Sequence, residues 1–152
     1  FIYQCGSDEN HRDRHSWFEK AISFGLTPKT LISPNAFVHE TASLGQGCIL
    51  YPGAKIMTNV TLGRNCIVLP NTVINHDSFI DDFSIINSAC VINGHVEIGR
   101  NSYIGSCTSI KERLSIHKNA TVGMNSVVLK SIESEGIYYG FPAKRRRDQL
   151  SG

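Results

Sequence analysis

The sequence is poor in charged residues and has no long hydrophobic run. Charged side chains make up 18% of the 152 residues, against about 25% in an average globular domain, which favours an extended buried interior. No stretch approaches the roughly 18 consecutive apolar residues of a membrane-spanning helix, so we expect no such helix. The formal net charge of +2 is too small to indicate nucleic-acid binding.

A signal peptide and metal-type cysteine pairs are also lacking. The chain begins at Phe1 rather than Met, so we expect the natural N-terminus to lie upstream. The five cysteines are an odd number. Cys48, Cys66 and Cys90 fall on small positions of the repeat described next, where a thiol packs as a small hydrophobe. A disulfide between Cys48 and Cys66 is conceivable, but free thiols in a reducing, cytoplasmic compartment are the better interpretation.

An aliphatic residue recurs at every sixth position. The series runs without a break from Val38 to Val128 and contains sixteen Val, Leu or Ile residues. The residue two places before each of them, from Ala42 to Ser126, is almost always small or β-branched. A fixed internal period is the signature of a solenoid. Hairpin strands would instead alternate with a period of two.

The hexad predicts an all-β solenoid with a triangular coil. Three hexads make one coil of 18 residues, so residues 18 apart stack at the strand spacing of roughly 4.8 Å. The backbone hydrogen bonds then run between coils, and each coil needs its neighbours to bury its interior.

The pattern divides the chain into three parts. Residues 1–35 do not follow the hexad, and we interpret them as the tail end of a βαβ domain whose beginning is absent. Residues 36–132 form the solenoid. Residues 133–152 leave the pattern and contain the basic run Lys144–Arg147. That run is either a solvated C-terminus or a site that captures a ligand phosphate.

Three elements are expected in the first part. Phe1–Cys5 and Leu31–Ile32 have the composition of short strands, and Ser7 to Phe24 that of a helix which Gly25 ends. The apolar stripe of this helix is expected to be Trp17, Phe18, Ala21 and Ile22.

One outward turn of the solenoid carries groups suited to proton transfer. His76 follows the inward Ile74 by two, and Asp77 is adjacent to it. A histidine backed by a carboxylate is a good general base near neutral pH. Gly94 lies 18 residues after His76, so it should stack one coil above. Its N–H could then stabilise an oxyanion. A surface histidine and a turn glycine are the alternative interpretation.

The stretches Asn75–Ile80, Asn93–Gly99 and Tyr139–Lys144 resemble the NeuD/PglD-like sugar acetyltransferases, which are hexapeptide-repeat acyltransferases. Residues 1–35 are similar to the C-terminal part of their small nucleotide-sugar-binding βαβ domain, and Gly6 to Arg12 loosely matches its Gly–polar–Arg stretch. The resemblance implies a left-handed parallel β-helix. It also implies acetyl transfer from acetyl-CoA to the amine of a nucleotide-linked deoxyamino sugar, in bacterial surface glycan synthesis. The expected assembly is a homotrimer that binds acetyl-CoA between neighbouring solenoids, without a metal.

The resemblance assigns roles to individual positions. His76 is the expected general base, Asp77 its acidic partner and Gly94 the backbone oxyanion donor. Asn75 and His95 are expected to line the acceptor side. The positions implied to contact acetyl-CoA are Gly94, Gly105, Ser106, Lys111, Gly140, Pro142, Ala143 and Lys144.

Two positions depart from the family pattern. The family commonly has a histidine nine residues after the base and an asparagine seven residues before it, and this chain has Ile85 and Leu69 there. Asn71, Asn75 or Asn87 are candidates to replace the lost contacts.

Three other functions are alternatives. O-acetylation of a sugar such as sialic acid would use the same base. A non-catalytic scaffold would have no need of His76, Asp77 or Gly94. Zinc chemistry would need His76, His95 and His117. Their spacings of 19 and 22 are expected to stack them in one column, which could not easily surround one ion.

Overall fold

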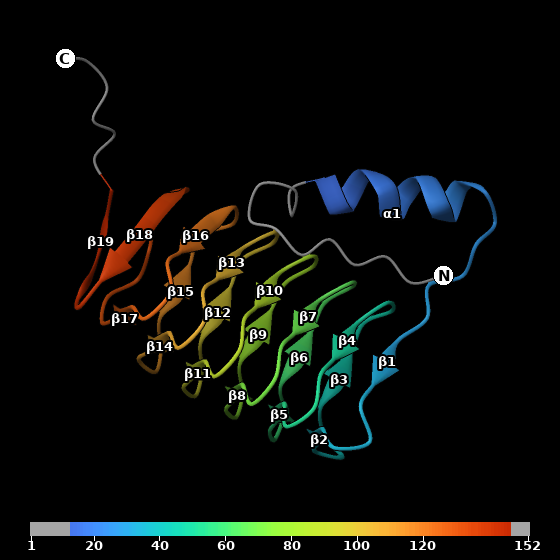
Figure 1. Ribbon diagram of the computed structural model, residues 1–152, viewed down its shortest axis with the longest axis horizontal. Coiled ribbons are helices and arrows are strands. Elements are labelled where there is room, and N and C mark those ends of the chain that lie inside the picture. Colours follow the sequence, from blue (N-terminus) through green and yellow to red (C-terminus); the bar gives the residue numbers. More distant parts are fainter. Residues whose placement is uncertain (1–12, 147–152) are drawn as a thin grey trace.

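The computed structural model describes residues 13–146, and it shows a parallel β-helix (Figure 1). Its strands are short and pair with the strands one coil before and one coil after them, as at Val91↔Val73 and Val91↔Ser109. The predicted fold class, a left-handed parallel β-helix built from hexads, is confirmed. The predicted strand Phe1–Cys5 and the stretch Gly6 to Arg12 lie outside the described residues.

The strands stack into three sheets, one for each face of the coil. Sheet A contains β1 (Leu31–Ile32), β4 (Ile49–Leu50), β7 (Ile67–Val68), β10 (Ile85–Ile86), β13 (Tyr103–Ile104), β16 (Ala120–Val122), β18 (Gly136–Gly140) and β19 (Ala143–Arg145). Sheet B contains β2 (Phe37–Val38), β5 (Lys55–Ile56), β8 (Val73–Ile74), β11 (Val91–Ile92), β14 (Ser109–Ile110) and β17 (Val127–Val128). Sheet C contains β3 (Ser43–Leu44), β6 (Thr61–Leu62), β9 (Phe79–Ile80), β12 (Glu97–Ile98) and β15 (Ser115–Ile116).

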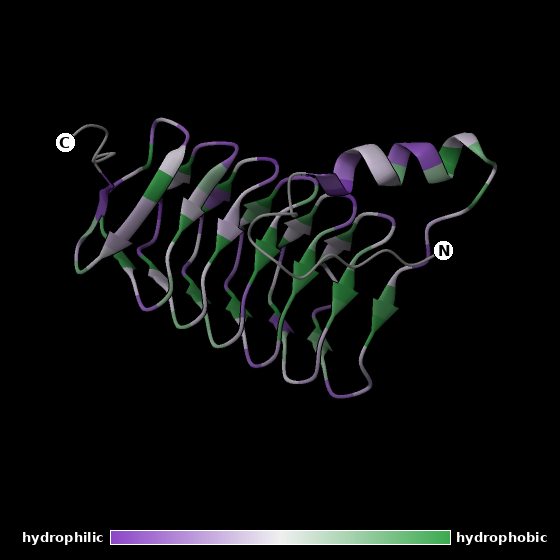
Figure 2. Cartoon of the chain, turned by 45° about the horizontal axis from the view of Figure 1, so that its top comes forward, coloured by the Kyte–Doolittle hydropathy of each residue, from purple (hydrophilic) through white to green (hydrophobic). Residues whose placement is uncertain are grey.

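The hexad aliphatics fill the interior. Ile74, Ile92 and Ile110 stack in sheet B and are fully buried. The small residues two places earlier are buried beside them, for example Thr72 and Cys90. Figure 2 shows hydrophobic strands in the N-terminal coils and paler strands toward the C-terminus. Cys48, Cys66 and Cys90 are buried free thiols, so no disulfide joins Cys48 to Cys66.

Each corner of the coil contains a residue in the left-handed conformation. This residue lies three places before each inward aliphatic, from Gly47 (φ 76°) to Asn125 (φ 57°). Glycine, asparagine, aspartate and histidine tolerate a positive φ best. Phe83 (φ 63°) is a bulky exception, and its packing is described next.

The N-terminal segment is tied to the corner between sheets C and A. The helix α1 (Arg14–Ser23) covers part of the range predicted to be helical, and residues 7–12 lie outside the described part. The predicted apolar stripe is wrong for Trp17 and Ile22, which are exposed. Instead Phe18 packs edge-on to Phe83, with ring centroids 5.4 Å apart. Arg14 is fully buried and donates through Nη1 to the carbonyl oxygen of Phe83 at 2.9 Å.

The solenoid begins earlier than the predicted boundary at residue 36. Leu31–Ile32, predicted as a strand, is β1, and it pairs in parallel with β4. Ile32 stands one hexad before Val38 and so belongs to the repeat. Whether residues 1–35 are the remnant of a βαβ domain stays a prediction.

The C-terminal part folds back on the last coil. β18 continues sheet A through Tyr138, which is buried and pairs with Val122. β19 pairs with it in antiparallel fashion, Tyr139 opposite Lys144. Arg147, the last residue of the basic run, lies outside the described residues. Within residues 13–146, no helix has the length and apolar character to cross a membrane.

Ile92→Ala should lower the free energy of unfolding by about 2–5 kcal/mol, because it leaves a cavity in a closed interior. Val91→Ala is the matched control, since Val91 lies on the same strand but is 38% exposed, and it should cost less than about 1 kcal/mol. Urea unfolding followed by circular dichroism measures both. Equal losses for the two variants would contradict the inward and outward assignment.

Candidate functional site

The candidate site lies at the corner between sheets B and C. The turn Asn75–His76–Asp77 connects β8 to β9. One coil further, Asn93–Gly94–His95 connects β11 to β12. His95 N–H donates to the carbonyl oxygen of His76 at 3.0 Å, which joins the two turns directly. The Asn75 side chain donates to the carbonyl oxygen of Ile92 at 3.1 Å.

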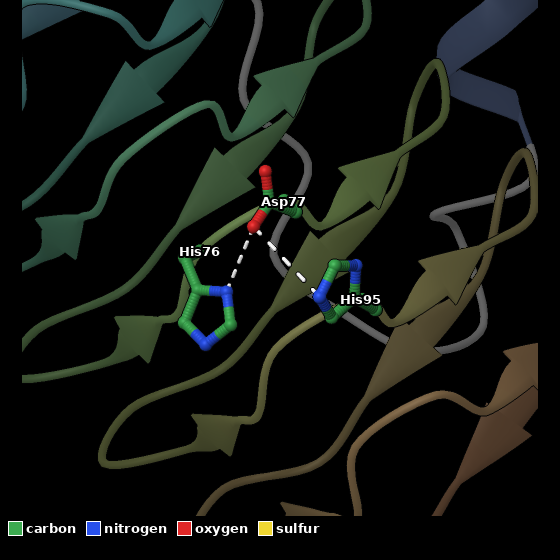
Figure 3. Close-up of side chains that lie close together, drawn as sticks. All are labelled: His76, Asp77 and His95. Atoms are coloured by element: carbon green, nitrogen blue, oxygen red, sulfur yellow. Dashed lines mark hydrogen bonds and ion pairs between the residues drawn. The ribbon is translucent and has the colours of Figure 1, made fainter.

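His76 and Asp77 form the predicted pair. His76 Nδ1 lies 2.9 Å from Asp77 Oδ2 (Figure 3). An ionised carboxylate only accepts hydrogen bonds, so Nδ1 carries the hydrogen and Nε2 keeps its lone pair. The His76 side chain is 57% exposed and that of Asp77 38% exposed. The pair therefore presents a basic nitrogen to the outside of the solenoid.

His95 belongs to the same cluster, as its position one coil after Asp77 predicts. Its Nε2 lies 3.8 Å from Asp77 Oδ2. The His95 and His76 rings meet edge to face, with centroids 5.3 Å apart. One carboxylate oxygen of Asp77 thus faces two imidazoles (Figure 3).

The other oxygen of Asp77 is held by Asn59, a residue that no sequence pattern singled out. Asn59 Nδ2 donates to Asp77 Oδ1 at 3.0 Å. This hydrogen bond and the one from His76 lower the pKa of the Asp77 carboxyl below its ordinary value. Asp77 is consequently ionised at neutral pH. Because its pKa is depressed in the folded state, the stabilisation it gives is present above the ordinary carboxyl pKa and is lost as the pH falls through the lowered one.

Gly94 lies directly against the imidazole of His76. A Cβ added to Gly94 would stand 2.5 Å from His76 Cε1 and 2.6 Å from Nε2. A side chain would fit there only if the His76 ring moved, so glycine is favoured by close approach rather than by its φ angle. Among residues 13–146, the Gly94 N–H forms no hydrogen bond, which leaves it available to a ligand.

One set of described residues is arranged closely enough to hold a metal ion. It consists of His76, Asp77 and His95, whose ligand atoms lie within 4.8 Å of one another. The alternative zinc set is not brought together. His117 lies at the corner between sheets C and A, after β15, so the expectation that it would stack in the column of His76 is wrong. Because His117 lies 22 residues after His95, and not 18, it falls at the next corner of the coil.

The positions implied to bind acetyl-CoA divide between two edges of sheet B. Gly94 and Lys111 lie at the corner between sheets B and C, on the same edge as His76. Gly105 and Ser106 lie at the corner between sheets A and B. The hairpin of β18 and β19, which holds the remaining predicted positions Gly140, Pro142, Ala143 and Lys144, is the C-terminal end of sheet A. A single chain therefore does not gather them at one point.

The two departures from the family pattern lie away from His76. Ile85 is buried on the outer side of sheet A, packed with Ile49 and Ile67, and Leu69 packs against the same cluster. Asn87 is buried, and its amide donates to the carbonyl oxygen of Ile104 at 2.8 Å.

Of the asparagines considered as replacements, Asn75 is adjacent to His76, whereas Asn71 lies, like Asn87, at the corner between sheets A and B. Two surface hollows, of about 230 and 330 Å³, are lined by other residues, mainly of sheets C and A. His76 instead stands on an open corner.

Comparisons with solved structures match this fold over most of the chain. The acetyltransferase domain of PglB from Neisseria gonorrhoeae is 28% identical with a TM-score of 0.88, and the match covers 90% of this chain and 67% of that one. It is also known in complex with acetyl coenzyme A, at the same identity and coverage. WeeI from Acinetobacter baumannii is 26% identical with a TM-score of 0.86, again covering 90% of this chain and 67% of that one.

A third structure shows likeness of fold. It is a variant of perosamine N-acetyltransferase from Caulobacter crescentus in complex with CoA and GDP-perosamine, 24% identical with a TM-score of 0.90, covering 91% of this chain and 66% of that one. The chain thus spans about two thirds of the length of these solved chains. No curated protein sequence matches it.

The hexad solenoid, the corner site and these neighbours together define a hexapeptide-repeat acyltransferase of the sugar acetyltransferase class, as the resemblance predicted. A family model described as "GMPPB C-terminal domain" matches residues 26–138, and the chain belongs to that family.

Gly94→Ala should displace the His76 ring, because the added methyl group would stand 2.5 Å from its Cε1. We expect a lower melting temperature and loss of most acetyl-transfer activity. The control is the same change in a His76→Ala background, where the methyl group has no ring to displace and should cost little further stability. Calorimetry gives the melting temperatures of the parent protein, the two single variants and the double variant. Additive losses of stability in the double variant would contradict the contact.

Proposed function

We propose that this protein transfers an acetyl group from acetyl-CoA to the amine of a nucleotide-linked deoxyamino sugar, with His76 as general base. The observation that carries the proposal is the geometry of His76. Its Nδ1 is held by Asp77 at 2.9 Å, so Nε2 is the nitrogen that can take a proton. Gly94, whose N–H is available to a ligand, lies against that same ring edge.

The proposed reaction is direct transfer. The sugar amine attacks the thioester carbonyl carbon, and His76 Nε2 accepts the proton that the amine loses. The negative charge of Asp77 stabilises the imidazolium, and the Gly94 N–H stabilises the oxyanion. When the tetrahedral intermediate collapses, the carbon–sulfur bond breaks and the thiolate of CoA takes the proton from His76.

The neighbours support the substrates. A PglB acetyltransferase domain binds acetyl coenzyme A, and a perosamine N-acetyltransferase binds CoA with GDP-perosamine. The resemblance adds the setting of bacterial surface glycan synthesis. The buried free thiols Cys48, Cys66 and Cys90 support the cytoplasmic location that the proposal assumes.

His76→Ala should lower turnover by about 10²–10⁴-fold, the usual range for the loss of a general base. Asp77→Asn should cost less, because it orients and polarises the imidazole. His117→Ala is the control: His117 is an exposed histidine at another corner, where its Nδ1 contacts the carbonyl oxygen of Lys118 at 2.6 Å. Acetyl-CoA consumption, assayed with a panel of nucleotide-linked amino sugars, measures all three.

His95 is unsuited to the role of neutral control, since it faces Asp77 at 3.8 Å. Near-normal turnover of His76→Ala, with folding intact, would place the base elsewhere and end this mechanism.

We further propose that the active assembly is a homotrimer. The catalytic residues lie at one edge of sheet B together with Lys111, whereas Gly105 and Ser106 of the acetyl-CoA positions lie at its other edge. A neighbouring copy that presents its corner between sheets A and B to the His76 corner would complete the site. The open position of His76, 57% exposed in one chain, supports the need for a second wall. Lys144 and Arg145, both exposed on β19, would meet the phosphates of CoA.

Sedimentation should therefore give a trimer at micromolar concentration. A chain cut after Gly140 should bind acetyl-CoA much more weakly in calorimetry, because it loses β19 and its basic residues. The cut keeps β18, whose Tyr138 is part of the core, so the solenoid should stay folded by circular dichroism. A stable monomer, or unchanged acetyl-CoA binding after the cut, would contradict the proposed donor site.

A further inference from the structure

A column of side chains runs along the corner between sheets B and C. From Asn59 to Arg113, the third residue of each turn has a left-handed backbone, with φ of 56° at Asn59, 57° at Asp77 and 57° at His95. Asp77 N–H donates to the carbonyl oxygen of Thr58 at 3.0 Å, and His95 N–H to that of His76 at the same distance. The shared backbone geometry brings side chains of successive coils into contact.

Within this column the two oxygens of Asp77 have different partners. Asn59 Nδ2 donates to Oδ1 at 3.0 Å, while Oδ2 lies 2.9 Å from His76 Nδ1. The torsion that turns a carboxylate is broad and weakly restricted, so a donor on one oxygen sets the direction of the other. We propose that Asn59 is a positioning residue, which orients the Asp77 carboxylate toward His76. This inference rests on the proposed function.

Asn59 is itself held in place from the preceding coil. Its backbone N–H donates to Thr41 Oγ1 at 2.9 Å. The hydroxyl of Thr41 also lies 3.0 Å from His39 Nδ1. Asn59 therefore transmits the position of the preceding turn to Asp77, even though its own side chain is exposed.

The chemistry of an amide suits this position. A neutral donor orients a carboxylate without cancelling its charge, which is needed to stabilise the His76 imidazolium. A lysine at position 59 would compete with His76 for the negative charge of Asp77, and an aspartate there would repel the Asp77 carboxylate. The Asn59 hydrogen bond is also the largest of the effects that lower the pKa of Asp77.

The chain provides a matched control. Asn101, with φ of 57°, donates through Nδ2 to Asn119 Oδ1 at 3.0 Å. This is the same contact between neighbouring coils, at the corner between sheets C and A. Glycine occupies the same turn position with positive φ at Gly47 and Gly53, so Asn→Gly removes the side chain and keeps a backbone that the fold already uses.

The test compares Asn59→Gly, Asn59→Asp and Asn101→Gly in the otherwise intact protein. Asn59→Gly should lower kcat about tenfold, the scale of a lost hydrogen bond to a charged group, and leave the KM for acetyl-CoA unchanged. Asn59→Asp has the same shape but cannot donate when ionised, so it should lose at least as much. Asn101→Gly should keep full activity.

Two further measurements separate positioning from a structural effect. In an Asp77→Asn background, Asn59→Gly should cost little more, because its effect passes through Asp77. Nitrogen-15 NMR of the histidines should show the Nδ1–H tautomer at His76 in the parent protein and a mixture of tautomers in Asn59→Gly.

The outcomes distinguish this inference from the proposed function. A fully active Asn59→Gly beside an inactive His76→Ala, or additive losses in the double variant, would overturn the role of Asn59 alone. A fully active His76→Ala would overturn the proposed function, and the positioning role with it.

Discussion

The site depends on one constraint, the constant offset of three hexads between hydrogen-bonded coils. Paired strands keep this offset from β1 to β17, as at Phe79↔Glu97 and Val91↔Val73, whereas the pairing of β16 with β18 has a shorter one. A slip by one residue would turn every inward isoleucine outward and expose the core. The buried interior therefore fixes the register, and the register decides which outward residues become neighbours. Gly94 meets His76 for this reason.

From Gly47 to Asn125, each corner has a left-handed residue, and these residues differ in how easily they adopt this conformation. At the His76 corner, Asn59, Asp77 and His95 are residue types that tolerate positive φ and carry polar groups, and Arg113 follows them. At the corner between sheets C and A, Phe83 has a positive φ, which is costly for a bulky residue. Phe83 is fully buried, and its packing against α1 offsets that cost. The corner between sheets B and C thus carries the candidate site, and the corner between sheets C and A packs against the N-terminal helix.

The fold was predictable because it depends on a period that the sequence displays without interruption. The stacking of His76, Gly94 and His95 follows from the same arithmetic, and so does the contact of Asn59 with Asp77, although an asparagine in a turn gives no signal of its own. The packing of α1 was not predictable, because a charged residue such as Arg14 is expected on the surface, whereas it is buried. The trimer, the roles of the site residues and the binding positions of acetyl-CoA remain predictions, because an outward residue does not reveal what lies beyond it.

The outward direction of the site explains its composition. Inside a solenoid, an ionised Asp77 would need compensation for the loss of water around its charge. On a corner it keeps that water while Asn59 and His76 fix its direction. The disadvantage is that the exposed corner of a single chain would not exclude water from the thioester of a bound acetyl-CoA. In the proposed trimer, where a neighbouring copy completes the site, both demands would be met. Each chain folds with its charges solvated, and the dry surroundings of the reaction would form only where two copies meet.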